Sequence, residues 1–144
     1  AGEAAGAESV ECALNFQAKR IGHGIRCTEN PLVMQELADR GVVLELCPTS
    51  NLNTKIYETI GDYPIQQLMN KGIRVTVNTD NMMVSDTTEA RELALVADIF
   101  NMEKKDVKQL IMNGVEAAFA TEVIKNRLRA RVETQFAKVA GIRG

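Results

Sequence analysis

Polar residues follow three apolar stretches of this sequence, at the point where each stretch ends. The first stretch ends at His23, which is the only histidine among the 144 residues and lies between two glycines. The second leads into residues 47–51 (C-P-T-S-N) and the third into residues 78–81 (N-T-D-N). An imidazole can move a proton near neutral pH, and a carboxylate such as Asp80 can bind a metal ion or orient a base. These three segments are therefore the candidates for chemistry.

The three apolar stretches, at residues 20–24, 42–47 and 73–80, are rich in Val, Ile and Leu, which predicts buried β-strands. Between the first two, Thr28 or Asn30 can cap a helix whose first turn holds Pro31, and Gly41 can end it. This alternation indicates a parallel sheet in an α/β fold. Active sites of parallel α/β folds gather at the C-terminal ends of the strands, so we expect the polar segments to meet at one edge.

Helical patterns fill the rest of the chain. We expect a helix within residues 1–19, one that opens at Pro64, and, after the third strand, one capped by Asp86 with Glu89 in its first turn. Two further helices complete the chain. The helix before Gly41 has an apolar face made of Leu32, Val33, Leu37 and Ala38. The two C-terminal helices have apolar faces made of Val107, Leu110, Ile111, Val115, Ala118 and Phe119, and of Ile124, Leu128, Val132, Phe136 and Val139, respectively. Three parallel strands neither close a barrel nor cover their own edges.

The composition excludes several classes of protein. With 45% apolar and 25% charged residues it is typical of soluble globular proteins. A formal charge of -2, with no basic stripe and no Trp, argues against nucleic acid as a partner. No apolar stretch approaches the roughly 20 residues that span a bilayer and no leader opens the chain, so we expect a cytoplasmic protein without membrane contact. Cys12, Cys27 and Cys47 predict reduced thiols, because they form no C-x-x-C pair and are odd in number.

Each candidate residue also has a structural interpretation. A histidine between glycines is usually a hydrogen-bonded structural residue, although small neighbours let a ligand approach it. Asp80 could cap the next turn, and Cys47 is better explained as a buried thiol than as a nucleophile. By composition alone, Glu3 would be a solvated charge near the N-terminus. Taken singly, the residues predict an α/β protein with a strand-end site and leave its chemistry open.

Four motifs taken together resemble a known family. The segments A-G-E-A-A-G (1–6), R-I-G-H-G (20–24), E-L-C-P-T-S-N (45–51) and V-N-T-D-N (77–81) have the order and spacing of the C-terminal half of adenosine deaminase, in the metal-dependent TIM-barrel adenosine/AMP deaminase family. The resemblance implies the C-terminal portion of a (β/α)8 TIM barrel followed by C-terminal helices. Residues 1–144 would be the C-terminal part of a metal-dependent hydrolase domain whose N-terminal half is absent, and the missing initiator Met agrees with this expectation.

The resemblance also implies roles for four residues. Glu3 corresponds to the acid that contacts N1 of the purine and donates a proton to it, and His23 to the histidine that orients and deprotonates the zinc-bound water. Asp80 corresponds to an aspartate that binds zinc and contacts that water. Asn81 stands where many relatives have a second aspartate, and its amide can donate a hydrogen bond to N7 of the purine. Zinc serves this chemistry because it lowers the pKa of water from about 15.7 toward about 7.

The implied activity of the complete protein is the zinc-dependent hydrolysis of adenosine to inosine and ammonia, a step of purine metabolism. Three of the four protein ligands of zinc lie upstream of Ala1 in the family, so we expect the chain alone to be inactive. Its exposed barrel edges favour self-association. Two alternatives stay open: a deaminase of adenine or another aminopurine, and a non-catalytic half-barrel that pairs with a copy of itself.

Overall fold

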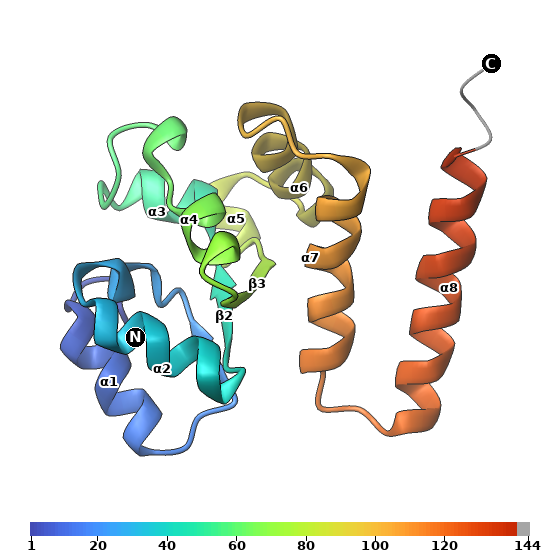
Figure 1. Cartoon of the computed structure of the whole chain (residues 1–144). Helices are drawn as coiled ribbons and strands as arrows, with labels where there is room; N and C mark the ends of the chain where they lie inside the picture. The colour runs from blue at the N-terminus through green and yellow to red at the C-terminus, as the bar shows by residue number, and fades with distance from the viewer. Residues whose placement is uncertain (141–144) are drawn as a thin grey trace.

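The computed structural model describes residues 1–140 and has a parallel sheet at its centre (Figure 1). The strands are β1 (Arg20–Gly22), β2 (Val43–Leu46) and β3 (Arg74–Val77), in the order β1-β2-β3. Both strand pairs are parallel, so the predicted sheet is confirmed. Strand β1 ends two residues earlier than its apolar stretch because His23 turns into a left-handed backbone conformation, with φ 61°. Residues 141–144 of the expected unit lie outside the described part.

One face of the sheet carries the apolar core. The helices α1 (Ala7–Asn15), α2 (Pro31–Arg40) and α4 (Ile65–Asn70) contribute buried side chains to it. The strand side chains in this core are at most 3% exposed: Ile21, Leu44, Leu46, Val75 and Val77. Successive residues of a strand point to opposite faces, which is why alternate positions along β1, β2 and β3 meet in one layer.

Helix α2 begins and ends at the residues that the sequence predicts. The Asn30 side chain accepts a hydrogen bond from the backbone N–H of Leu32 at 3.0 Å, and Gly41 ends the helix with φ 60°. The expected apolar face is partly wrong, because Leu32 is 79% exposed and Met34 is buried in its place. The buried stripe runs through Val33, Met34 and Leu37, and Leu32 in the first turn lies outside it.

Short elements that the sequence does not predict connect the longer ones. They are η1 (Ile25–Glu29), α3 (Pro48–Asn53), η2 (Ile60–Asp62) and α5 (Met82–Ser85). Each has at most six residues, which is too short for an apolar period to show. Helix α3 matters most for the site, because it turns the segment after β2 into the first turns of a helix. Its one sequence signal is Pro48, the favoured residue type at a first helical position.

Helix α6 (Glu89–Ile99) begins at a different cap from the one predicted. The side chain of Thr88 accepts a hydrogen bond from the backbone N–H of Arg91 at 3.3 Å. An N-cap residue needs an extended backbone, and Thr88 has one, whereas Asp86 is left-handed with φ 45° and ends α5. The prediction of a helix was therefore right and the prediction of Asp86 as its cap was wrong.

Helix α7 (Lys104–Ala117) packs against β3. The side-chain amide of Asn113, which is 7% exposed, donates a hydrogen bond of 2.8 Å to the carbonyl of Val75. This bond joins the helix directly to the backbone of the third strand. Phe119, expected on the apolar face of this helix, lies beyond its end and is 81% exposed. Its ring instead lies under the guanidinium of Arg20, 4.1 Å from the ring centroid.

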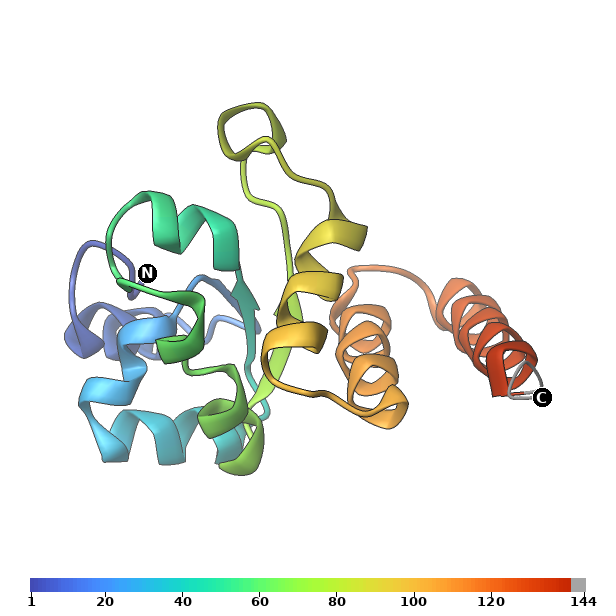
Figure 2. The same cartoon turned by 90° about the horizontal axis from the view of Figure 1, so that it is seen from above.

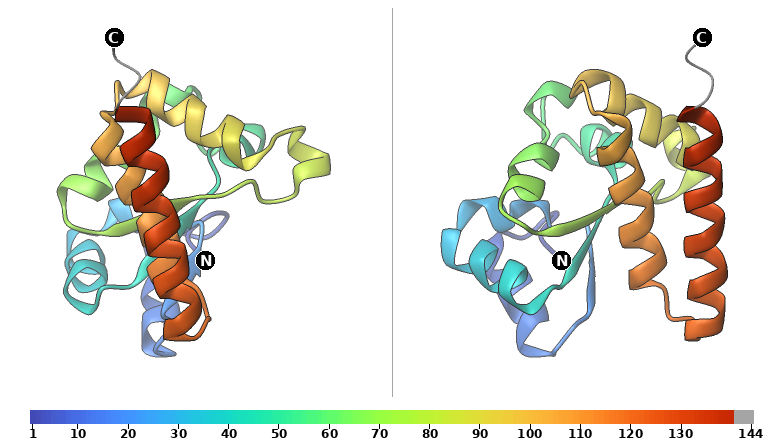
Figure 3. Two further views of the ribbon diagram at one scale, coloured as in Figure 1. Left: turned by 90° about the vertical axis from the view of Figure 1, so that its right-hand side faces the viewer. Right: turned by 45° about the vertical axis from the view of Figure 1, so that its right-hand side comes forward.

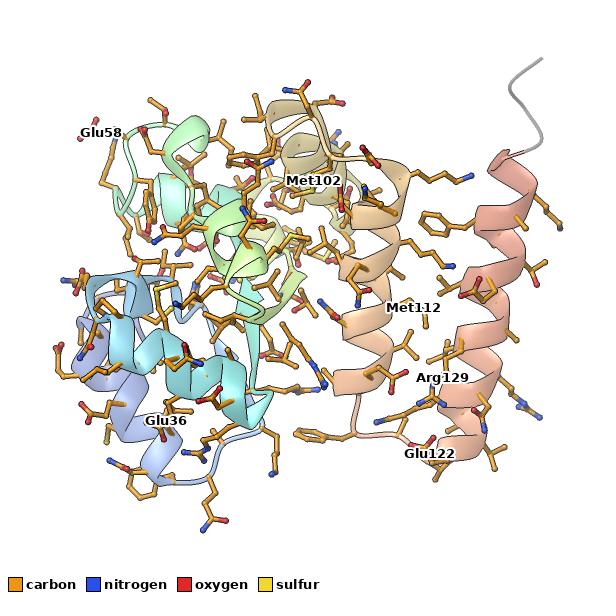
Figure 4. All side chains as sticks on the ribbon, in the orientation of Figure 1. Glu36, Glu58, Met102, Met112, Glu122 and Arg129 are labelled. Atoms are coloured by element: carbon orange, nitrogen blue, oxygen red, sulfur yellow. The ribbon has the colours of Figure 1, made fainter. Side chains whose placement is uncertain are left out.

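Helix α8 (Glu122–Ala140) lies on the far side of α7 from the sheet, as Figures 2 and 3 show. Arg129 of α8, labelled in Figure 4, pairs with Glu116 of α7 at 2.7 Å. Ile124, expected on its apolar face, is 46% exposed, and the side chain of Val139 lies outside the described residues. No helix in the described part of the chain combines the length and the apolarity that crossing a membrane requires.

The second face of the sheet is polar. The Nε of Arg20 lies 3.1 Å from the Oε1 of Glu45, and Thr76 is the neighbour of Glu45 in the strand register. A cavity of about 470 Å³ lies over these residues, with α6 and α7 on its far wall. In a closed α/β barrel, this face would line the interior.

Candidate active site

Two strand ends place His23 and Asp80 at the same edge of the sheet. His23 follows β1 directly, and Asp80 lies three residues after β3. The Nε2 of His23 is 3.9 Å from the Oδ2 of Asp80. The prediction that these two residues lie at the same end of the sheet is therefore confirmed.

The backbone at both residues is strained. His23 has φ 61° and Asp80 has φ 55°, in the left-handed region that residues other than glycine visit infrequently. The backbone N–H of His23 still donates to the carbonyl of Glu45 in β2 at 2.9 Å. This bond holds the backbone of His23 to the sheet, while its left-handed conformation changes the direction of its side chain. Such conformations cost about 1–3 kcal/mol each and cluster at functional sites. Two of them side by side indicate a functional edge.

The segment before α1 brings Glu3 to this edge. The carbonyl of Ala1 accepts a hydrogen bond from Gly24 at 2.8 Å, and a Cβ on Gly2 would lie only 2.9 Å from the Cα of Gly24. Because two glycines meet here, the segments approach closely and the Oε2 of Glu3 comes within 3.4 Å of the Nε2 of His23. Glu3 is 29% exposed and is not the solvated charge that composition alone suggests.

Helix α3 supplies two buried polar residues to the site. Ser50, which is 7% exposed, donates a hydrogen bond of 2.7 Å to the Oδ2 of Asp80. Asn51 is fully buried, and its Nδ2 lies 3.1 Å from the Nδ1 of His23 and 3.3 Å from the Oε1 of Glu3. Both residues belong to the C-P-T-S-N segment, but nothing in the sequence assigns them to these partners.

Tyr63 also belongs to the site, and the sequence does not single it out. Its hydroxyl donates to the Oδ1 of Asn51 at 3.0 Å, and its side chain is 2% exposed. Burial raises the pKa of the Tyr63 hydroxyl, so the group keeps its proton. The only nearby signal in the sequence is Pro64, which marks the start of α4 and says nothing of the direction of the tyrosine.

Asn81 caps α5. Its Oδ1 accepts hydrogen bonds from the backbone N–H groups of Met83 and Val84, at 3.1 and 3.2 Å. The Nδ2 end of the amide is not used in this cap. Capping through the oxygen and donation through the nitrogen are therefore compatible, so Asn81 can hold the turn and donate to a ligand at once.

Cys47 lies next to this edge but is not an activated nucleophile. Burial raises the pKa of its thiol to about 12, and the carboxylates of Asp80 and Glu3 act in the same direction. Burial likewise raises the pKa of Cys27 to about 12. A thiol is nucleophilic as its thiolate, so these environments disfavour reaction. The interpretation of Cys47 as a buried thiol agrees with this.

Alkylation should separate the three cysteines. At about pH 8, where a solvated thiol is partly ionised, we expect iodoacetamide to modify exposed Cys12 within minutes and to leave Cys27 and Cys47 unmodified until the protein is denatured. Peptide mass spectrometry of samples taken over time measures this order. Modification of Cys47 as fast as Cys12 in the folded protein would contradict the burial of the thiol.

A metal ion at this edge would need ligands from beyond the described chain. Residues 1–140 contain no group of three His, Cys, Asp or Glu side chains that could hold a metal ion. A catalytic zinc site generally uses three protein ligands and keeps one position for water. Asp80, which is 42% exposed and held by Ser50, fits one ligand of such a site. The described residues do not form a complete site by themselves.

The fold and this edge together define a class of protein. A parallel sheet whose strand ends gather an imidazole and two carboxylates is typical of hydrolases built on an α/β barrel. The family model described as adenosine deaminase matches residues 1–135, and the chain belongs to the adenosine deaminase family. The resemblance of the four motifs is thus confirmed, and with it the C-terminal portion of a barrel followed by helices.

Two curated relatives illustrate the similarity. The chain is 44% identical over 136 residues to an adenosine deaminase of Haemophilus ducreyi. This match covers 94% of this chain and 40% of the relative. It is 42% identical over 134 residues to an adenine deaminase of Chelativorans sp.. This second match covers 92% of this chain and 41% of the relative. The chain therefore spans about two fifths of the length of the curated relatives it matches.

Two solved structures have the same fold over about two fifths of their chains. The adenine deaminase of Arthrobacter aurescens superposes with a TM-score of 0.91 at 28% identity, over 96% of this chain and 42% of that one. An amidohydrolase of Burkholderia ambifaria, solved with bound zinc, superposes with a TM-score of 0.87 at 25% identity, over 98% and 40%.

Proposed function

We propose that the complete protein containing these residues is a hydrolytic deaminase that converts adenosine to inosine and ammonia. The observation that carries the proposal is the convergence of three side chains: the Nε2 of His23 lies 3.4 Å from Glu3 and 3.9 Å from Asp80. The adenosine deaminase named among the relatives supports the choice of substrate. Residues 1–144 are, in this proposal, the C-terminal part of one hydrolase domain.

The proposal includes a zinc ion. The zinc bound to the B. ambifaria amidohydrolase supports this choice of metal. Asp80 would supply one ligand, and segments that this chain does not span would supply the others. When bound, zinc lowers the pKa of a coordinated water from about 15.7 to about 7, which makes a nucleophile available at neutral pH.

The residues of this chain would orient the reactants and move protons. His23 directs Nε2 toward the space between the two carboxylates, where it orients a water and accepts its proton. Glu3 faces the same space and would donate a proton to N1 of the purine, which offsets the charge that develops on the ring when water adds at C6. The free amide nitrogen of Asn81 would donate to N7. Proton donor, base and ligand thus come from three segments that meet at one edge.

Adenine is the second candidate substrate. The adenine deaminase of Chelativorans is 42% identical to this chain, and that of A. aurescens is a solved structure with a TM-score of 0.91. The two candidates differ by the ribose, and a site that hydrogen-bonds a substrate hydroxyl discriminates strongly against the compound that lacks it.

Kinetics of the complete enzyme test both candidates. The loss of the 6-amino group changes the ultraviolet absorbance of the purine, so kcat/KM for adenosine and for adenine can be measured in one assay. We expect the higher value for adenosine. A higher value for adenine would replace the first candidate by the second, and no turnover of either purine would overturn the deaminase proposal.

The isolated 144-residue chain should be inert. We expect no inosine and no tightly bound zinc, because Asp80 is one ligand and His23 as a second would no longer act as the base. We also propose that the isolated chain covers its exposed edges by self-association. A coupled assay, metal analysis and light scattering measure these properties. Chelator-sensitive inosine formation proportional to protein concentration, or a folded monomer of 15.8 kDa, would contradict the respective expectation.

A further inference from the structure

The side-chain amide of Asn51 is the only hydrogen-bond partner of the His23 Nδ1 within residues 1–140. The two groups are 3.1 Å apart, and Asn51 is fully buried. The same amide nitrogen lies 3.3 Å from the Oε1 of Glu3, and the oxygen at its other end accepts from Tyr63 at 3.0 Å. One buried amide therefore contacts the proposed base, the proposed acid and a buried phenol.

This contact decides which imidazole nitrogen carries the proton. The amide nitrogen of Asn51 can only donate, so the Nδ1 that faces it must accept, and a neutral His23 then holds its proton on Nε2. In that state the protonated Nε2 lies 3.4 Å from the Oε2 of Glu3. A carboxylate at Glu3 accepts from the Asn51 amide and lies beside the protonated Nε2, so the three side chains are mutually compatible in this state.

Tyr63 makes a second orientation of the same amide possible. A phenol hydroxyl both donates and accepts, so it can bind either end of the Asn51 amide. If the amide turns by half a revolution, its oxygen faces Nδ1, which must then carry the proton, and Nε2 becomes free to accept one. The same oxygen then also faces the Oε1 of Glu3, so this orientation requires Glu3 to be protonated and to donate to it. The two ends of the amide are nearly equal in size, so the exchange needs no change in packing.

We propose that Asn51, held by Tyr63, is the positioning residue that selects the tautomer of His23. The orientation found in the chain holds a proton on Nε2, and the reversed orientation frees Nε2 as a base. The consequence for turnover rests on the proposed function, whereas the tautomer itself does not. Asn51 acts through His23 and Glu3 and needs no contact with the purine.

Nitrogen NMR of the chain tests the tautomer directly. His23 is the only histidine of the 144 residues, so every imidazole ¹⁵N signal of the labelled chain comes from it. At a pH where the ring is neutral, we expect Nε2 to be protonated in the unaltered chain. In the Asn51→Asp variant, an ionised carboxylate faces Nδ1 and can only accept a hydrogen bond, so the proton should move to Nδ1. Asn53→Asp, the same change at an exposed position of α3, should leave the tautomer unaltered.

Kinetics of the complete enzyme supply a second measurement. At metal sites, removing an outer hydrogen-bond partner that orients a histidine typically costs about 10- to 100-fold in activity, and we expect a similar loss for the partner of His23. We expect Asn51→Leu to lower kcat by that factor with KM changed less than about threefold, Asn51→Asp to recover part of the loss, and Asn53→Asp to have no effect. A Tyr63→Phe enzyme should show an intermediate kcat, because the Asn51 amide remains beside His23 but loses the hydrogen bond from the Tyr63 hydroxyl that holds it.

Different results would overturn the role of Asn51 and the proposed deaminase function. The same tautomer in the unaltered, Asn51→Asp and Asn53→Asp chains would overturn the role of Asn51, and so would a kcat for Asn51→Leu that falls only in proportion to the folded fraction. If the altered chain does not fold, the same spectra are recorded on the complete protein, where the His23 signals are those absent from a His23→Gln sample. If the complete unaltered enzyme turns over no purine, the proposed function fails while the nitrogen signals still decide the tautomer.

Discussion

Glu3→Gln should lower the kcat of the complete enzyme by about 100- to 10,000-fold and leave its metal content unchanged. The amide has nearly the same shape as the acid and can still contact Asn51 and the purine, but it cannot give up a proton to N1. Glu3 lies 3.4 Å from His23, on the segment before α1, whereas Asp80 lies on the segment after β3. The loss should therefore fall on turnover and not on the binding of the ion.

The matched control for Glu3→Gln is Glu11→Gln, the same change at an exposed position of α1. Steady-state kinetics and metal analysis by mass spectrometry on the three proteins provide the comparison. We expect the Glu11 variant to equal the unaltered enzyme in both. A Glu3→Gln enzyme that retains more than about a tenth of its kcat would show that Glu3 is not the proton donor.

Replacement of Asp80 should remove the metal and the activity together. Asp80 is the one residue of this chain that fits a zinc ligand, and loss of the ion returns the pKa of water toward about 15.7. We expect activity to fall at least as far as for Glu3→Gln. The contrast between the two variants is the metal content, which should persist in one and be lost in the other.

The backbone at Asp80 decides which substitution is informative. Its φ of 55° costs less for Asp and Asn, whose short polar side chains tolerate the left-handed region, than for alanine, which adds strain there. Asp80→Asn therefore removes the negative ligand with little effect on the turn, and Asp80→Ala reports both effects. Asp98→Ala, at an exposed position of α6, is the control. Equal loss of zinc in the Glu3 and Asp80 variants would show that the assignment of roles is wrong.

The strands and their shared edge could be predicted from the sequence, because both depend on local patterns. Runs of β-branched residues, Pro31 and Gly41 specify a strand, a crossover and another strand, and parallel strands must end at one edge. His23 and Asp80 follow from this geometry alone. The position of Glu3 does not, because a contact between Gly2 and Gly24 establishes it, and no periodicity in the sequence reports such a contact.

The surroundings of the site could not be predicted for a related reason. Asn51 and Tyr63 are twelve residues apart, and their hydrogen bond depends on where α3 and α4 settle against the core. The cap at Asp86 was mispredicted because its left-handed backbone is set by the preceding turn and not by residue type. The partners of a polar side chain depend on tertiary structure, whereas the periodicity of apolar residues can be read from the sequence alone.

The glycine contact beside the site has a consequence for how the acid and the base behave on heating. Gly24 has Gly2 on one side and the core residue Leu44 on the other, where a Cβ would lie 2.6 Å from a methyl of that leucine. No side chain lies between the backbones of Gly2 and Gly24, so their contact fixes how far the backbone of Glu3 lies from the backbone of His23. Rotation about side-chain bonds does not change this spacing between the two backbones. The alignment of acid and base should instead persist up to the temperature at which the core itself melts, and then be lost with it in one cooperative step.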